Sequence, residues 1–223
     1  MRSATRSQLL LGAFAGLIVL AIAGSFYYGA KKKRDLESSA AASVADATAR
    51  LRDAAALSLD SPQAAALLQA HEAALGGSLE RLRAEDASRN KALAEAAELY
   101  LVDVQAIVRV QVNATRALAA ARASRRALAA HMENAEGRGT GWIQRALALK
   151  AKAERDNFDA RTALGALAGL YYAHPESQQK LRAAAPQAPL LAEEQRRRLH
   201  QAAKDAEAKA GQDLEQLRRL PIG

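Results

Sequence analysis

Four histidines and one glycine-rich turn are the residues whose types could support chemistry at a defined site. The histidines are His71, His131, His174 and His200. None is followed by another histidine at the spacing that places two imidazoles on one helical face. The chain has no cysteine, which excludes thiolate catalysis, disulfides and cysteine-based metal sites. We therefore expect solvated surface histidines and no bound metal.

Gly137, Gly139 and Gly141 are spaced as in a phosphate-binding loop, but neither a preceding strand pattern nor a following Lys-Ser or Lys-Thr pair accompanies them. No nucleophile motif occurs. The carboxylates are scattered among lysines and arginines, so no pair stands out as a general acid and base. We predict a turn between two helices, no catalytic residue and no cofactor. An enzyme would need a buried charged cluster that the sequence does not display.

The single tryptophan and two runs of arginines are the other conspicuous side chains, and packing or exposure to solvent explains each of them. Trp142, the only tryptophan, follows the glycine turn and is expected to pack at the end of a helical bundle, with partner contact as the alternative. The runs Arg125–Arg126 and Arg196–Arg198 are expected to face solvent. Contact with a phosphate or an acidic partner remains the alternative for both runs.

An uncharged apolar run covers residues 9–30. At ~1.5 Å per residue, its length matches the roughly 30 Å hydrocarbon core of a bilayer. Aromatic residues end the run and basic residues follow it, which is typical of the boundary between a membrane and water. We predict contact with anionic lipid headgroups there. This membrane flank consists of Tyr27, Tyr28, Lys31, Lys32, Lys33 and Arg34.

The same run resembles a secretory signal, because Ala21-Ile22-Ala23 fits a cleavage pattern. Its length and the basic cluster favour a retained signal-anchor, and a cleaved signal is the alternative. The larger number of basic residues after the run favours a cytoplasmic body over a periplasmic one. Gly12 and Gly16 form a GxxxG pair that would allow two membrane helices to approach closely, although such pairs also arise by chance.

The net charge of +8 does not indicate nucleic-acid binding. Six basic residues and no acidic residue lie in the first 34 positions, which leaves 26 basic and 24 acidic residues for the rest. The body is therefore nearly neutral, with interleaved charges typical of solvated helices. More than half of its apolar residues are alanine, which favours helices packed over thin seams. An Ala- and Arg-rich composition is typical of GC-rich bacteria.

Helical periodicity follows the apolar run almost to the end of the chain. We predict helices over 35–59, 62–86, 88–136, 142–173, 176–184 and 190–220. Ser88 is expected to cap the third helix, and Gly76-Gly77 to kink or end the second. In the fourth, Leu147 and Phe158 are expected on the apolar stripe. The short glycine turn makes the third and fourth helices a long antiparallel αα-hairpin.

The predicted fold is all-α, with one N-terminal transmembrane helix followed by a helical bundle or coiled coil. We divide the chain into an N-terminal tail (1–8), a transmembrane helix (9–30), a basic flank (31–34) and the helical domain (35–223). The expected protein is a non-enzymatic interaction or scaffold protein of a bacterial inner membrane, with a protein partner or self-association. A periplasmic sensor or ligand-binding bundle is the alternative.

Overall fold

The computed structural model describes the backbone of residues 3–59, 61, 63–133 and 139–222. It describes side chains within these ranges from residue 25 onward, except at residue 89. Every regular element in the described part of the chain is a helix, so the predicted all-α class and the helical bundle are confirmed.

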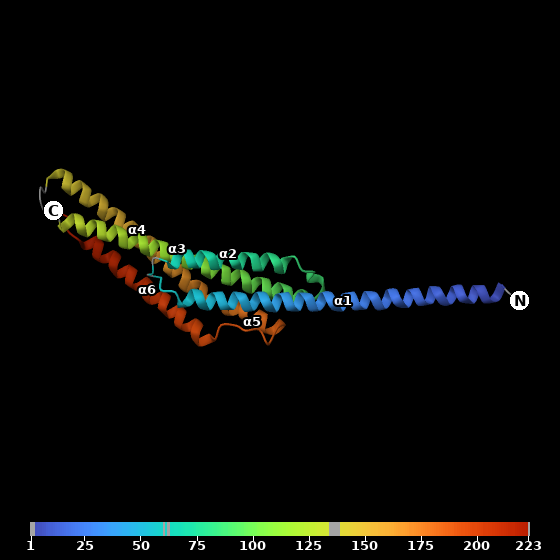
Figure 1. Ribbon diagram of the computed structural model, residues 1–223. Helices are drawn as coiled ribbons and strands as arrows, with labels where there is room; N and C mark the ends of the chain where they lie inside the picture. The colour runs from blue at the N-terminus through green and yellow to red at the C-terminus, as the bar shows by residue number, and fades with distance from the viewer. Residues whose placement is uncertain (1–2, 60, 62, 134–138, 223) are drawn as a thin grey trace.

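Helix α1 (Ser3–Ala56) runs without a break from the apolar segment into the bundle. No proline or glycine interrupts the stretch between Ala30 and Ala56, so nothing in this sequence ends the helix earlier. Figure 1 shows its N-terminal part extending away from the other helices as a single rod. Its C-terminal part buries Leu36, Val44 and Leu51 against α2 and α3.

Helix α2 (Ala64–Arg83) and the 3₁₀ turn η1 (Ala87–Arg89) lead into the long helix α3 (Lys91–Glu133). The glycines at 76 and 77 lie inside α2, so the prediction that the helix could end there is wrong. The predicted cap is wrong as well, because Ser88 instead hydrogen-bonds Asp86. Asn90 takes its place and accepts a hydrogen bond from the Leu93 amide at 3.3 Å.

Helices α4 (Thr140–Ala173) and α6 (Glu193–Arg219) form the distal half of the bundle, which is the half farther from the N-terminus. The short helix α5 (Pro175–Ala184) folds back onto α3. The first half of α3 packs on α1 and α2, whereas its second half packs on α4 and α6 (Figure 1). The predicted boundary at His174-Pro175 is where α4 ends and α5 begins. Residues 134–138, which include Gly137, lie outside the described residues.

A seven-residue repeat of buried positions runs through the bundle, as in coiled coils. In α3 the buried positions include Tyr100, Ile107, Ala114, Ala121 and Leu128. In α4 they alternate between two heptad series: Ala146, Ala153, Ala160 and Leu167 in one, and Asn157, Leu164 and Tyr171 in the other. Small side chains dominate the distal seam, so these helices pack closely over a thin core.

The predicted apolar stripe of α4 is wrong at Leu147 and Phe158, and also at Ala151, which the same spacing places on the stripe and which is exposed. Leu147 and Phe158 are about half exposed, at 51% and 53%. Alanines occupy much of the buried face along which α4 packs on α3 and α6. Leu147 and Phe158 face outward, although they are more hydrophobic than these buried alanines.

Candidate functional site

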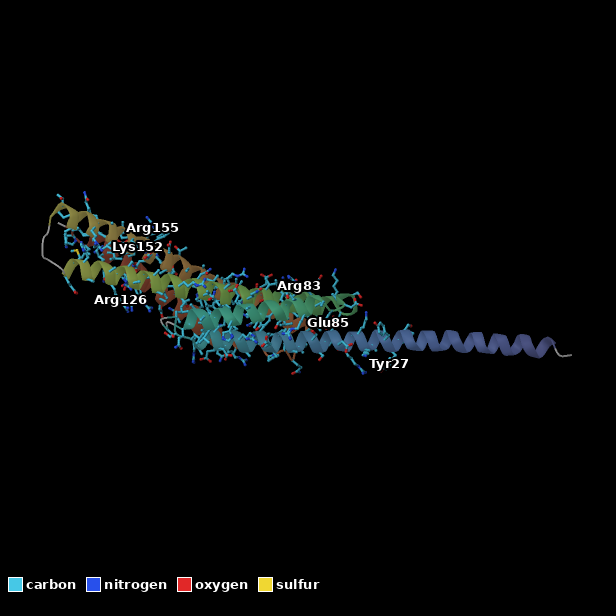
Figure 2. The ribbon with its side chains drawn as sticks, turned by 45° about the horizontal axis from the view of Figure 1, so that its top comes forward. Tyr27, Arg83, Glu85, Arg126, Lys152 and Arg155 are labelled. Atoms are coloured by element: carbon cyan, nitrogen blue, oxygen red, sulfur yellow. The ribbon has the colours of Figure 1, made fainter. Side chains whose placement is uncertain are left out.

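The aromatic part of the membrane flank lies on α1 before this helix reaches the other helices. Phe26, Tyr27 and Tyr28 are exposed by 75%, 75% and 58% of their surfaces. Consecutive helical residues are about 100° apart, so these three rings spread over much of the helix circumference. Figure 2 shows Tyr27 projecting from α1 outside the bundle. Such an aromatic collar fits the interface of a bilayer better than bulk water.

The basic part of the flank joins α1 to the nearest turn of the bundle. The Lys32 ammonium lies 5.0 Å from the centre of the Tyr28 ring and 3.8 Å from an Asp86 carboxylate oxygen. Lys33 lies 3.8 Å from the Glu37 carboxylate. Such exposed pairs contribute ~0–1 kcal/mol, so a lipid phosphate can replace either carboxylate at little cost.

Lys31 and Arg34 complete the flank, and both are exposed. Neither makes an ion pair within the part of the chain that the structure describes. They therefore add positive charge next to the collar, and clustered basic side chains of this kind attract anionic headgroups.

The predicted membrane span itself falls largely outside the described side chains. Gly12 and Gly16 lie in the helical backbone of α1, but the surroundings of residues 3–24 are not described. Among the residues whose side chains the structure describes, no helix is both long and apolar enough to cross a membrane.

One histidine contradicts the prediction of solvated imidazoles. His174 is buried, whereas His71, His131 and His200 are each partly buried. The burial of His174 follows from its place at the α4–α5 corner, where α5 turns back onto α3. Its ring lies 5.4 Å from that of Tyr100.

The side chains around His174 resemble a catalytic triad in type but not in geometry. The Ser177 hydroxyl and an Asp103 carboxylate oxygen lie 3.4 Å and 3.9 Å from Nδ1 of His174. In a serine triad the nucleophile and the carboxylate face opposite ring nitrogens. Here both face the same nitrogen, and the Ser177 hydroxyl also lies 3.0 Å from the His174 carbonyl. The arrangement fastens the α4–α5 corner to α3.

The environment of Asp103 at this corner favours the ionised form of its carboxylate. Burial alone would raise its pKa, but interactions with His174 and Ser177, together with the charge of Lys180, hold the pKa below its ordinary value. The ionised carboxylate therefore stabilises the packing of α5 on α3.

A second buried polar contact joins α1 to α3. The Tyr100 hydroxyl lies 2.7 Å from Oγ1 of Thr48, and the same Thr48 hydroxyl donates to the Val44 carbonyl at 2.9 Å. A threonine hydroxyl has only one proton, so Tyr100 must be the donor in the first contact. Burial raises the pKa of Tyr100, which keeps its hydroxyl protonated in that role.

Gln111 and Tyr171 form a third buried contact, between α3 and α4. The Gln111 amide donates to the Tyr171 hydroxyl at 3.2 Å, and burial raises the pKa of Tyr171. Tyr171 is buried, whereas the adjacent Tyr172 is exposed. These neutral contacts specify how the helices pair.

The candidate partner-binding arginines are mostly engaged within the protein. Arg125 pairs with Asp213 across α3 and α6, and Arg196 donates to the Tyr171 carbonyl at 3.2 Å. Arg197 and Arg198 pair with Glu193 and Glu194 one turn earlier on α6. In the part of the chain that the structure describes, no three His, Asp or Glu side chains converge as metal ligands.

Trp142 packs at the distal end of the bundle. Its ring stacks on that of His131 with centres 5.0 Å apart, and its carbonyl lies 3.0 Å from Nε2 of the same histidine. The contact connects the start of α4 to the end of α3. Trp142 therefore packs at the end of the bundle, as the sequence predicts.

A cavity of about 330 Å³ lies at the opposite end of the bundle. It is bounded by α1, the start of α3, the end of α5 and the connector at 185–189. No local sequence pattern predicts this site, because its walls come from four separate segments of the chain.

No family model, curated protein or solved structure matches the chain.

Proposed function

We propose that this chain is a single-pass membrane protein whose helical body acts through protein–protein contacts near the bilayer. Residues 9–30 span a bacterial inner membrane as a retained signal-anchor, and Lys31–Arg34 bind anionic headgroups. The body is a non-enzymatic interaction or scaffold domain.

The observation that carries this proposal is the continuity of α1. One helix contains the apolar segment, the exposed aromatic collar and the first buried turns of the bundle. A rigid helix holds the bundle at a fixed distance and direction from whatever embeds its N-terminal part. This arrangement suits a protein that presents a surface to a partner at the membrane.

The surface best suited to a partner lies on α4. Leu147 and Phe158 are eleven residues apart, about three helical turns, so they project from one face. The exposed Ala151 lies between them. Large exposed apolar side chains that share one face are typical of protein contacts.

The test is crosslinking of the full chain in native membranes. Phe158→Glu together with Leu147→Glu places charges on the α4 face, and we expect loss of the crosslinked adduct. The matched control is Leu67→Glu, which alters an equally exposed leucine on α2 and should leave the adduct in place. A chain that forms no adduct with a partner or a second copy contradicts the proposal.

A periplasmic ligand-binding bundle is the second candidate function. The cavity near the membrane flank favours it, because about 330 Å³ lies within the usual range for ligand pockets, ~300–1,000 Å³. A reporter fused after residue 223 separates the candidates. We expect a cytoplasmic signal, from the basic residues that follow the apolar run. A purely periplasmic signal favours the ligand-binding bundle.

A further inference from the structure

Most of the residues that line the cavity at the flank end of the bundle are apolar, and Glu37, Asn90 and Gln187 are its polar members. Ala40 and Val44 line it from α1, Leu93 from α3, and Leu181 and Ala184 from α5. Ala188 lies on the far side in the connector. Alanine methyl groups are too short to meet across this space, so the wall residues leave it open.

The connector between α5 and α6 forms an arch over this space. Leu181 and Leu191 are both buried and anchor its two ends. Arg52 also donates to the Leu190 carbonyl at 3.3 Å. Between these points Pro186 and Pro189 restrict the backbone, so the arch resists collapse into the cavity. Figure 1 shows α5 and the connector near the place where α1 enters the bundle.

A charged side chain in the lining of the cavity pairs with a lysine of the membrane flank. Glu37 is the only charged residue in its lining, and its carboxylate pairs with Lys33. Ala40 follows Lys33 by seven residues, which places the apolar wall about 10 Å along the helix from that lysine. An apolar group inside the cavity can therefore be joined to a negative group beside the basic flank.

The size of the cavity selects among apolar occupants. A partner helix of ten residues is ~15 Å long and ~10 Å wide, which is several times larger than this space. A single acyl chain is narrow and flexible enough to enter it. Most of its lining is apolar, so an acyl chain gains more from entering it than water does.

We propose that this cavity binds one acyl chain of an anionic membrane lipid, whose headgroup lies against the basic flank. This inference rests on the proposed membrane anchor. In this arrangement one acyl chain of the lipid bends out of the bilayer, and its end lies between α1, α5 and the connector. The headgroup phosphate then competes with Glu37 for Lys33.

The test uses the full chain in phosphatidylcholine nanodiscs that contain phosphatidylglycerol with a photoreactive group near the end of one acyl chain. After irradiation, mass spectrometry maps the lipid adducts. We expect adducts on residues 181–190 in addition to those on the apolar segment 9–30. Phosphatidylcholine with the same photoreactive chain should label residues 181–190 less.

Two neighbouring alanines provide the variant and its control. Ala184→Leu fills the cavity and should remove the adducts on residues 181–190. Ala183→Leu adds the same side chain at an exposed position outside the lining and should leave them unchanged. Circular dichroism of both variants shows whether the fold is retained. Lys33→Gln should lower the preference for phosphatidylglycerol roughly fivefold, as expected for one lysine near an anionic surface.

The outcomes separate this inference from the anchor on which it depends. If the protein resists alkaline extraction from membranes but carries lipid adducts only within residues 9–30, the inference is wrong and the anchor is retained. The inference is also wrong if the two leucine variants carry the same adducts on residues 181–190. Equal labelling by the two lipids contradicts the role of the anionic headgroup. If alkali releases the protein from membranes, the anchor and the inference both fall.

Discussion

The hydrogen bond between Tyr100 and Thr48 should couple α1 to the bundle, and a double-mutant cycle measures that coupling. Both side chains are almost completely buried, and the donor and acceptor oxygens lie 2.7 Å apart. Tyr100→Phe removes the donor but leaves Thr48 donating to Val44. We expect it to lower the free energy of unfolding by about 1 kcal/mol, the usual net value of one hydrogen bond.

Thr48→Val should cost more, although it removes the same hydrogen bond. It leaves the Tyr100 hydroxyl buried without an acceptor, at a cost of about 1–3 kcal/mol. The double variant removes both polar groups, so no buried donor is left without a partner. Its loss should therefore fall about 1–2 kcal/mol short of the sum of the single losses.

Denaturant unfolding of the full chain in detergent micelles, followed by far-ultraviolet circular dichroism, gives the four free energies of the cycle. If the losses add to within about 0.5 kcal/mol, the two residues are independent. That result would refute both the assigned hydrogen bond and its part in joining α1 to α3.

Three further changes test the packing and the charges of the bundle. Leu164→Ala should destabilise the fold by about 2–5 kcal/mol in denaturant unfolding, whereas Leu147→Ala should change it by less than ~0.5 kcal/mol, and similar losses would contradict the assigned α4 face. Gly77→Ala should raise the melting temperature through a gain of ~0.5–1 kcal/mol, because a Cβ there meets open space within α2; a fall would show strain at this position. Asp103→Asn should remove stability that is present above about pH 4 and is lost as the pH falls through the lowered pKa of the carboxyl group. The melting temperatures of variant and wild type should therefore converge below about pH 4, and a constant gap would contradict the role of the charge.

Helix existence was predictable because the apolar spacing repeats with a helical period over long stretches. On α3, Ala97, Leu101, Val104 and Val108 recur at this spacing and all four are buried. On α6, the buried residues Ala203, Ala210, Leu214 and Leu217 recur at the same kind of spacing. Both patterns place the apolar residues on one face, where bundle packing buries them.

Residue types alone do not predict which side chains of α4 are buried. Phe158 has more apolar surface than Ala153 or Ala160, so hydrophobicity places it inward. The observed order depends on how α4 packs against α3 and α6, which is a tertiary property that residue types do not encode. The seven-residue spacing of Ala146, Ala153 and Ala160 is the signal that identifies this seam.

The burial of His174 and the cavity depend on chain reversals between α4 and α6. Periodicity describes each helix separately and does not say where α5 folds back. His174-Pro175 indicates a boundary but not its direction. The cavity needs α1, α3, α5 and the connector together, so no local pattern predicts it.

The most direct test of the central claim is the intact mass of the protein recovered from the membrane fraction after alkaline extraction. A retained signal-anchor predicts a membrane-bound chain that keeps residues 1–23. A chain that lacks those residues and is released by alkali would contradict the anchored helical body.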